Sequence, residues 1–155
     1  TAVCPTGALT EKAMLGKGRK WEVQKVRTTC PFCGVGCNFD LNVKGGKVIG
    51  VTSNAAAPAN SRDLCVKGRF GTDYVHSPSR LTKPLIKKNG EFVESSWDDA
   101  LDLVAKKFGE IKTKFGSDSI AALSSARCTN EDNYVMQKFM RAVIGTNNVD
   151  HCART

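Results

Sequence analysis

The first half of the chain contains one stretch in which apolar and polar residues alternate, and this pattern predicts a β-hairpin. Apolar side chains recur at every second position over residues 38–43, the pattern continues through Val48 and Val51 within 47–52, and Gly45-Gly46 between the two segments permits a tight turn. A polar loop of small residues follows, from Ser53 to Arg62. A basic stretch, Lys17 to Arg27, precedes the hairpin, and we expect it to be a linker.

After Pro78 the pattern predicts a second hairpin, over 85–94, and then alternating helices and strands. Apolar residues recur at helical spacing between a capping residue, Ser96, and a terminating Gly116, so one face of this helix should be buried. The short apolar run Ser119 to Leu123 suits a buried parallel strand, and a second helix is predicted at about 131–144. Helix, strand, polar loop and helix indicate the start of an α/β wound domain, whose ligands bind at the carboxyl ends of strands.

Composition and charge exclude several classes of protein. The 155 residues are 41% hydrophobic and 25% charged, which is typical of a globular protein, and the longest apolar runs are too short for a membrane segment. Lys and Arg exceed Asp and Glu by 23 to 15, so the net charge of +8 favours anionic partners. The basic residues are scattered and no nucleic-acid motif accompanies them, so we expect a phosphorylated cofactor and no nucleic acid.

The cysteines predict a metal centre. Seven cysteines, an odd number with tight local spacing, indicate metal ligation in a reducing compartment, and hence a cytoplasmic location, instead of a secreted disulfide framework. Cys30-x2-Cys33-x3-Cys37 places three thiolates on one glycine-containing loop, and Cys65 supplies a fourth from a distant segment. Four thiolates around one compact object suit a [4Fe-4S] cluster. Tetrahedral zinc is the alternative, although zinc ribbons usually supply two paired knuckles.

A second cysteine motif lies near the beginning of the chain. Cys4-Pro5 and the four residues after it resemble the end of the cysteine run in bacterial-type two-cluster ferredoxins. The resemblance implies that Cys4 is a ligand of a further [4Fe-4S] cluster in an upstream ferredoxin-like module. Residues 1–15 would then be the tail of that module and 16–27 the linker. The alternative is a free surface thiol.

Four motifs in order resemble the amino-terminal region of molybdopterin oxidoreductases, and specifically of the formate dehydrogenases, from about Thr28 to Thr155. They are Thr29-Cys30-Pro31-Phe32-Cys33-Gly34-Val35-Gly36-Cys37, Cys65-Val66-Lys67-Gly68-Arg69-Phe70, Arg127-Cys128-Thr129-Asn130-Glu131 and Asn148-Val149-Asp150-His151-Cys152-Ala153-Arg154. The resemblance implies an α/β fold, α+β overall. A small [4Fe-4S] domain with a β-hairpin would span 28–80, and the truncated start of the molybdopterin-binding α/β domain would span 81–155.

The resemblance also implies roles for individual residues. Lys67 would lie between cluster and pterin and be the catalytic residue of this segment, although a solvated surface lysine is the alternative. Considered alone, Thr129 is a helix cap and Cys128 a small buried residue. The residues expected to contact a molybdopterin guanine dinucleotide carrying molybdenum or tungsten are Arg127, Cys128, Thr129, Asn130, Glu131, Cys152 and Arg154.

The implied activity is the oxidation of formate to carbon dioxide, or its reverse, with electrons passing to a partner subunit. In formate dehydrogenases the residue after the position of Thr155 is the metal-ligating cysteine or selenocysteine, so this chain alone should be inactive. Termination at an in-frame UGA codon is one hypothesis for its end. Alternatives are a nitrate reductase, the large iron-sulfur subunit of an NADH dehydrogenase, or a stand-alone iron-sulfur or zinc module, although the motif from His151 to Arg154 favours formate.

Overall fold

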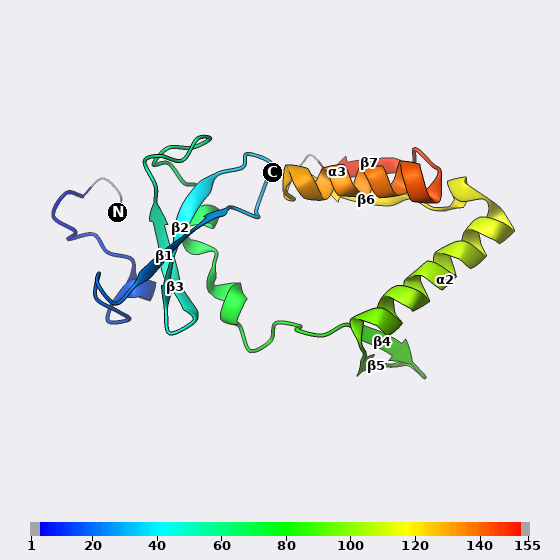
Figure 1. Ribbon diagram of the computed structural model, residues 1–155, viewed down its shortest axis with the longest axis horizontal. Coiled ribbons are helices and arrows are strands. Elements are labelled where there is room, and N and C mark those ends of the chain that lie inside the picture. The colour runs from blue at the N-terminus through cyan, green and yellow to red at the C-terminus, as the bar shows by residue number, and fades with distance from the viewer. Residues whose placement is uncertain (1–3, 153–155) are drawn as a thin grey trace. The chain divides into compact units, whose positions relative to one another are not determined.

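A computed structural model of the chain describes residues 4–152 (Figure 1). The chain forms two compact units. Unit 1 comprises Thr1–Arg80 together with Arg127–Asn130, and unit 2 comprises Leu81–Ala126 and Glu131–Thr155. Strands and helices occur in both, which confirms the mixed fold class. None of the helices within residues 4–152 has the length and apolar character needed to cross a membrane.

Unit 1 is built on a three-stranded antiparallel sheet in the order β1-β2-β3. The strands are β1 (Gln24–Thr29), β2 (Asn38–Lys44) and β3 (Lys47–Ser53), so the predicted hairpin is confirmed as β2 and β3. The expected linker, Lys17–Arg27, is corrected at its end, because its last four residues form the start of β1. Almost every residue of this edge strand is exposed, so it lacks the apolar alternation by which a half-buried strand is recognised.

The core of unit 1 lies between this sheet and the cysteine segments. Its buried residues are Cys30, Phe39 and Val51, and Phe39 is only 1% exposed. Partly buried side chains packed against them include Phe32, Cys37, Leu41 and Leu64. Two of the predicted cluster ligands therefore belong to the hydrophobic core, which fixes the cysteine loop to the sheet.

Three short helical segments cover unit 1: η1 (Lys12–Met14), α1 (Val66–Phe70) and η2 (Asp73–His76). Met14 lies directly over Gly50 of β3, where a side-chain carbon on the glycine would come within 2.5 Å of the methionine Cγ. A glycine at this position therefore allows the amino-terminal segment to contact the strand.

Unit 2 begins with the second predicted hairpin, now confirmed as β4 (Leu85–Lys88) and β5 (Glu91–Glu94). The turn residues Asn89 and Gly90 both have positive φ, 53° and 92°. Two left-handed residues in succession are what a type I′ turn requires, and asparagine and glycine adopt this conformation at little cost.

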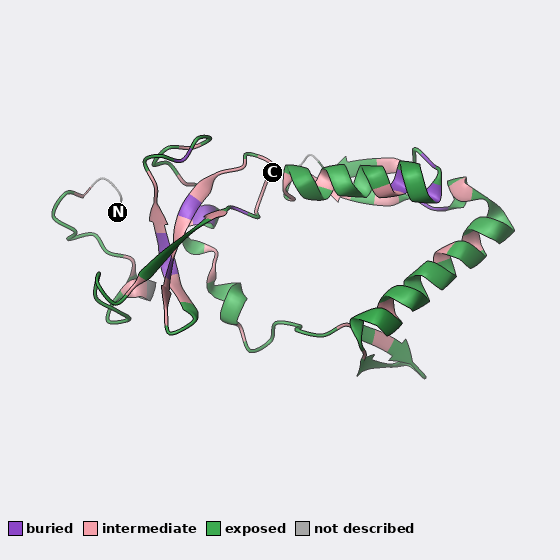
Figure 2. Cartoon of the chain, viewed as in Figure 1, coloured by how far each residue is buried: buried purple, intermediate pink, exposed green. Residues whose placement is uncertain are grey.

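The predicted helix is confirmed as α2 (Trp97–Phe115). At its start the Ser96 hydroxyl oxygen accepts the Asp99 N–H at 3.1 Å, and Gly116 with φ 84° ends it. The expectation that one face would be buried is wrong, because no residue of α2 is buried and most of its surface is exposed (Figure 2). Phe108 and Ile111 alone are partly buried against the core of unit 2.

A parallel pair of strands, β6 (Ala122–Ser125) and β7 (Val149–Cys152), forms the rest of unit 2 with one long helical segment. That segment is α3 (Asn130–Phe139), which continues as the π-helical turn η4 (Met140–Ile144). Met140, Ile144 and Ile120 form the core, against which Ala122 and Val149 of the strands pack.

The prediction of a buried strand over Ser119–Leu123 is corrected in two ways. The strand starts later, because Ser117–Ser119 forms the 3-10 turn η3. It is parallel as expected, but it is not buried, since Leu123 is 82% exposed. Among the described residues, Ala122 and Val149 pack against the core of unit 2, whereas Leu123 faces solvent.

Candidate functional site

The three clustered cysteines lie on the loop that joins β1 to β2. The N–H of Cys30 donates a 2.7 Å hydrogen bond to the carbonyl oxygen of Cys37, which closes the loop at its base. Cys30 is buried, and Cys33 and Cys37 are half-buried. Gly36 has φ 73°, a left-handed conformation that glycine adopts without strain and that turns the loop back towards β2. The sheet thus presents three thiols within one short connection.

The fourth cysteine, Cys65, immediately precedes α1. Its carbonyl oxygen accepts the N–H of Arg69 at 3.0 Å, so the first turn of the helix holds its backbone. Gly68 on the same helix is buried, and a side-chain carbon there would lie 3.6 Å from the Cys30 sulfur. Since glycine has no side chain, α1 leaves open the space beside this sulfur.

The electrostatics of the thiols link the four cysteines to one another. Burial, as the largest cause, raises the pKa of Cys30, and the thiols of Cys37, Cys33 and Cys65 raise it further against a lowering by the Phe32 N–H. Burial also raises the pKa of Cys37, with further contributions from Cys33 and Cys65. The structure therefore brings the four predicted ligands within electrostatic reach of each other.

This donor set fits an iron-sulfur cluster. The four thiols are free, they come from two loops on one small domain, and soft thiolates are the ligands that iron-sulfur clusters use. A bound cation relieves the mutual repulsion of the thiolates, so metal binding would release their protons. Within residues 4–152, no three Cys, His, Asp or Glu side chains are gathered tightly enough to hold a single metal ion.

Lys67 lies on α1, two residues after Cys65, and its side chain is exposed. Its carbonyl oxygen accepts the N–H of Gly71 at 2.8 Å, which ends the helix. Lys67 therefore lies beside the predicted ligand Cys65, as expected. Its contact with a pterin stays a prediction.

Cys4 lies in a tight turn near the start of the described chain. Its sulfur and the Thr6 hydroxyl form a 3.4 Å hydrogen bond. The Thr6 hydroxyl, as the largest cause, and the backbone N–H groups of Leu9, Thr6 and Ala8 lower the pKa of Cys4 from 9.0 to about 6. The loop therefore favours the thiolate, which is the form that binds metal, and the role of Cys4 as a cluster ligand stays a prediction.

The residues predicted to contact a dinucleotide follow the two parallel strands. Ser125 and Cys152, the last residues of β6 and β7, are register partners, and the N–H of Ala126 donates to the Cys152 carbonyl at 3.2 Å. The loop that begins at Arg127 thus follows the carboxyl end of β6, and Cys152 is the carboxyl end of β7. The α/β pattern predicts ligand-binding residues at these strand ends. Arg154 lies outside the described residues.

Within the loop, Cys128 and Thr129 are half-buried and Arg127 is exposed. Thr129 directly precedes α3, the position of a helix cap, and Asn130 and Glu131 open the helix. Asn130 belongs to unit 1 and donates its side-chain amide to the carbonyl oxygen of Gly34 at 2.8 Å.

One residue that sequence reasoning missed is Asn133, which fixes the end of β6. Its Nδ2 donates to the Ser125 carbonyl at 2.9 Å, and its Oδ1 accepts the Ser124 hydroxyl and, at 3.4 Å, the Ser125 N–H. No sequence motif predicts this role for a single asparagine inside a helix. Its only signal is a polar residue at an inward position of a helix that follows a polar loop.

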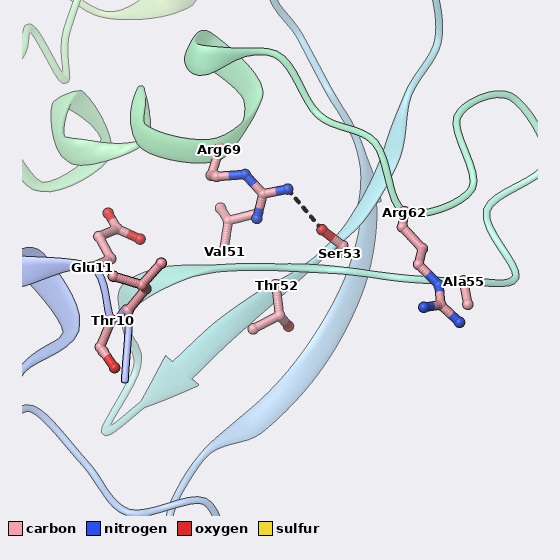
Figure 3. A pocket seen from close by; sticks show the side chains of 9 residues that line it. Thr10, Glu11, Val51, Thr52, Ser53, Ala55, Arg62 and Arg69 are labelled. Carbon is pink, nitrogen blue, oxygen red and sulfur yellow. Dashed lines mark hydrogen bonds between the residues drawn. The ribbon is translucent and has the colours of Figure 1, made fainter. Parts of the chain in front are cut away.

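A cavity of about 370 Å³ lies between the amino-terminal segment, β3 and the region of α1 (Figure 3). The Arg69 guanidinium donates a 3.0 Å hydrogen bond to the Ser53 hydroxyl at its wall. Burial, followed by the charge of Asp73, raises the pKa of Glu11, and Arg69 and Lys17 oppose that shift. The cavity is lined by Leu9, Thr10, Glu11, Val51, Thr52, Ser53, Ala55, Arg62 and Arg69. The sequence did not predict it.

The two cysteine segments on a small antiparallel sheet, followed by a parallel α/β segment, indicate a metal-binding domain ahead of an α/β cofactor-binding domain. Two family profiles match the chain: "Molybdopterin oxidoreductase Fe4S4 domain" over residues 23–77 and "Molybdopterin oxidoreductase" over 80–155. The chain belongs to the molybdopterin oxidoreductase family. Its cofactors are a [4Fe-4S] cluster and molybdopterin.

Several bacterial proteins are similar to this chain. "Putative formate dehydrogenase YrhE" and "Probable oxidoreductase YjgC" of Bacillus subtilis (strain 168) are each 52% identical over 136 residues, covering 88% of this chain and 14% of their own length. "Putative formate dehydrogenase SA2102" of Staphylococcus aureus (strain N315) is 45% identical over 158 residues, covering 94% of this chain and 16% of its own length. The chain therefore spans about one seventh of the relatives it matches.

Proposed function

We propose that this chain is part of the catalytic subunit of a formate dehydrogenase. The reaction oxidises formate to carbon dioxide with the release of one proton and two electrons, or runs in reverse. The single observation that carries the proposal is a set of four free thiols, from two segments of a molybdopterin oxidoreductase Fe4S4 domain, that lie within electrostatic reach of one another. The names of two of the relatives described above support formate as the substrate.

In this proposal Cys30, Cys33, Cys37 and Cys65 hold the [4Fe-4S] cluster. Such a cluster accepts and passes on single electrons at a potential that depends on its surroundings. The burial of Cys30 keeps water from one side of the thiolate group, and the Cys30–Cys37 hydrogen bond holds the loop closed. The protein thereby keeps the sulfur positions fixed while the charge of the group changes.

The cofactor residues are proposed on the same basis. Lys67 supplies an exposed cation beside the cluster segment, able to donate hydrogen bonds to a bound pterin. The loop Arg127–Glu131, with Cys152 and Arg154, contacts the guanine dinucleotide, whose metal, molybdenum or tungsten, supplies the two-electron chemistry when bound. Electrons leave to a partner subunit, with Cys4 serving a further cluster in an upstream module. We propose that the enzyme is cytoplasmic.

Anaerobic reconstitution with iron and sulfide tests the cluster assignment. We expect the 155-residue chain to bind about four iron atoms and to show the electron paramagnetic resonance of a reduced cubane. Cys65→Ser should abolish the wild-type spectrum, because one of the four soft ligands is lost. Cys128→Ser removes another free, half-buried cysteine and should leave the spectrum unchanged. A colourless protein that binds zinc and no iron would refute the assignment.

Steady-state kinetics of the full-length subunit tests the substrate. Formate-dependent reduction of a viologen dye is expected, with no nitrate reduction and no oxidation of NADH. The 155-residue chain by itself should not turn over formate. Nitrate reduction by an enzyme that still contains the cluster would contradict formate as the substrate. It would not contradict the assignment of the cluster ligands.

A further inference from the structure

The side chain of Asn60 connects the two segments that carry the predicted cluster ligands. Its Oδ1 accepts the N–H of Asn38 at 2.7 Å, and its Nδ2 donates to the carbonyl oxygens of Asn38 at 3.2 Å and of Asp63 at 2.7 Å. Asn38 directly follows Cys37, and Asp63 precedes Cys65 by two residues. One amide group therefore spans the backbones beside ligands from both loops.

The bonds to Asn38 replace a missing neighbour on its β3 side, since on its other side Asn38 pairs with Thr29 of β1. Asn38 is the first residue of β2, and the register with β3 begins only at Phe39, which pairs with Ser53. The side-chain amide of Asn60 offers one acceptor and one donor to the same residue, as a neighbouring strand would. Asn60 thus extends the sheet by one pairing at the point where the chain leaves the cysteine loop.

The backbone around Asn60 is itself held in place. The Asp63 N–H donates to the Asn60 carbonyl at 2.8 Å, and the Ser61 N–H donates to the Ala57 carbonyl at 3.0 Å. Ser61 has φ 49°, a left-handed conformation that a serine rarely adopts and that the surrounding hydrogen bonds sustain. Ala57, to which this turn is tied, is buried. The amide is therefore presented from a fixed turn.

We propose that Asn60 is a positioning residue that sets the separation of Cys37 and Cys65 before the cluster binds. The inference rests on the proposed role of the four cysteines as cluster ligands. Asn60 hydrogen-bonds main-chain atoms next to the ligands, so it acts through the backbone and does not ligate iron. When the two cysteine loops are already held in position, they lose less conformational freedom as the cluster binds. The cluster is then bound more tightly and in one geometry.

Cluster retention and spectroscopy of two variants test this role. Asn60→Ala removes these bonds together with a longer one, 3.4 Å, from Nδ2 to the Ser61 carbonyl. Asn60→Asp keeps the acceptor for the Asn38 N–H but places a carboxylate against the three carbonyl oxygens. Both should lose iron to a chelator faster than the wild type, because residues that support metal ligands typically contribute about 10- to 100-fold to metal affinity. Their paramagnetic resonance should broaden, because the sulfur positions become heterogeneous.

Asn54→Ala is the matched control. The Asn54 amide donates to both carboxylate oxygens of Asp40 at 2.9 and 3.1 Å and accepts the N–H of Ala56 at 2.9 Å, so it supports the same sheet without reaching either cysteine segment. This variant should keep the wild-type spectrum and chelation rate. Equal effects of Asn54→Ala and Asn60→Ala would overturn the proposal, since Asn60 would then support stability alone.

Hydrogen exchange of the metal-free wild type tests the preformed contact without any variant. The Asn38 amide should exchange as slowly as the neighbouring sheet amides, because Asn60 accepts its proton before metal is present. Fast exchange at Asn38 would overturn the inference, as would wild-type iron retention in both Asn60 variants. If the wild type itself fails to assemble a cluster, the proposed function fails first, which separates the two outcomes.

Discussion

Thr146, a buried residue, donates its hydroxyl to the Asp118 carboxylate at 2.6 Å. The backbone carbonyl of Asp118 also accepts the side-chain amide of Asn148 at 3.0 Å. Asp118 lies just before β6, and the other two residues lie just before β7. The amino-terminal entries of the parallel strands are therefore tied together at one residue, which helps to set the register at their opposite, carboxyl edge.

Replacing Asp118 should destabilise unit 2. Asp118→Ala leaves the Thr146 hydroxyl proton buried without its acceptor, and we expect the free energy of unfolding to fall by about 1–3 kcal/mol. Asp118→Asn retains an oxygen that can accept the bond and should lose less. Urea denaturation followed by circular dichroism measures both. Asp102→Ala, an exposed carboxylate on α2, is the control, and an equal loss in that variant would contradict the explanation.

Gly71→Ala should disturb the cysteine loop from a distance. A side-chain carbon at Gly71 would lie 2.6 Å from the carbonyl oxygen of Lys67 and 2.9 Å from the ring of Phe32, which stands between two predicted ligands. We expect a loss of stability of about 1–3 kcal/mol, typical of overpacking, and less iron bound after reconstitution. Thermal melting and iron analysis are the measurements.

Gly109→Ala is the matched control for that substitution. Gly109 lies inside α2, and a side-chain carbon there would meet nothing within 4 Å. Alanine in an exposed helix interior should raise stability by about 0.5–1 kcal/mol and leave iron binding unchanged. Unaltered iron binding in Gly71→Ala would show that the Phe32 ring adjusts without moving the loop.

Glu11→Gln should change how stability depends on pH. Burial raises the pKa of Glu11 above its ordinary value of 4.5, so folding opposes ionisation of this carboxyl group. The folded state then binds more protons than the unfolded state, and stability falls as pH rises from about 4.5 through the raised folded pKa. Glutamine removes this loss. The variant should be the more stable protein at pH 7, with the difference vanishing at low pH.

Thermal melting at a series of pH values checks this, with Glu110→Gln as a control of opposite sign. A hydrogen bond from Lys107 lowers the pKa of Glu110, so its contribution is present above the ordinary glutamate pKa and is lost as pH falls through the folded pKa. Glu110→Gln should therefore be no more stable than the wild type at pH 7. Parallel curves for wild type and Glu11→Gln would rule out the buried carboxyl as a source of the slope.

Local patterns predicted much of the secondary structure. Asn89-Gly90 identified the turn between β4 and β5 because its backbone preference is intrinsic, and Ser96 identified the start of α2 because the cap is a local hydrogen bond. The strand β1 was missed because an exposed edge strand needs no apolar alternation. The helical spacing of apolar residues predicted α2 correctly. It did not predict the exposure of the helix, because spacing alone does not determine what packs against the apolar side chains.

For the candidate site, the sequence singled out the four cysteines, and their role as cluster ligands stays a prediction. The spacing of the cysteines predicted a metal site that includes Cys30 and Cys65, because clustered cysteines in such a sequence are typical of metal ligands. The amide contacts of Asn60 and Asn133 were not predicted. Each amide binds backbone atoms that come together only in the folded chain, and such a contact produces no recurring pattern in the sequence. The Arg69–Ser53 bond is of the same kind.

The open strand pair of unit 2 affects how the chain will behave in a concentrated sample. In the described residues β6 pairs only with β7, and Leu123 on β6 is 82% exposed. Unpaired strand edges beside apolar side chains are templates for intermolecular strand addition. Self-association that grows with concentration should therefore start at β6, and a lysine in place of Leu123 should suppress it.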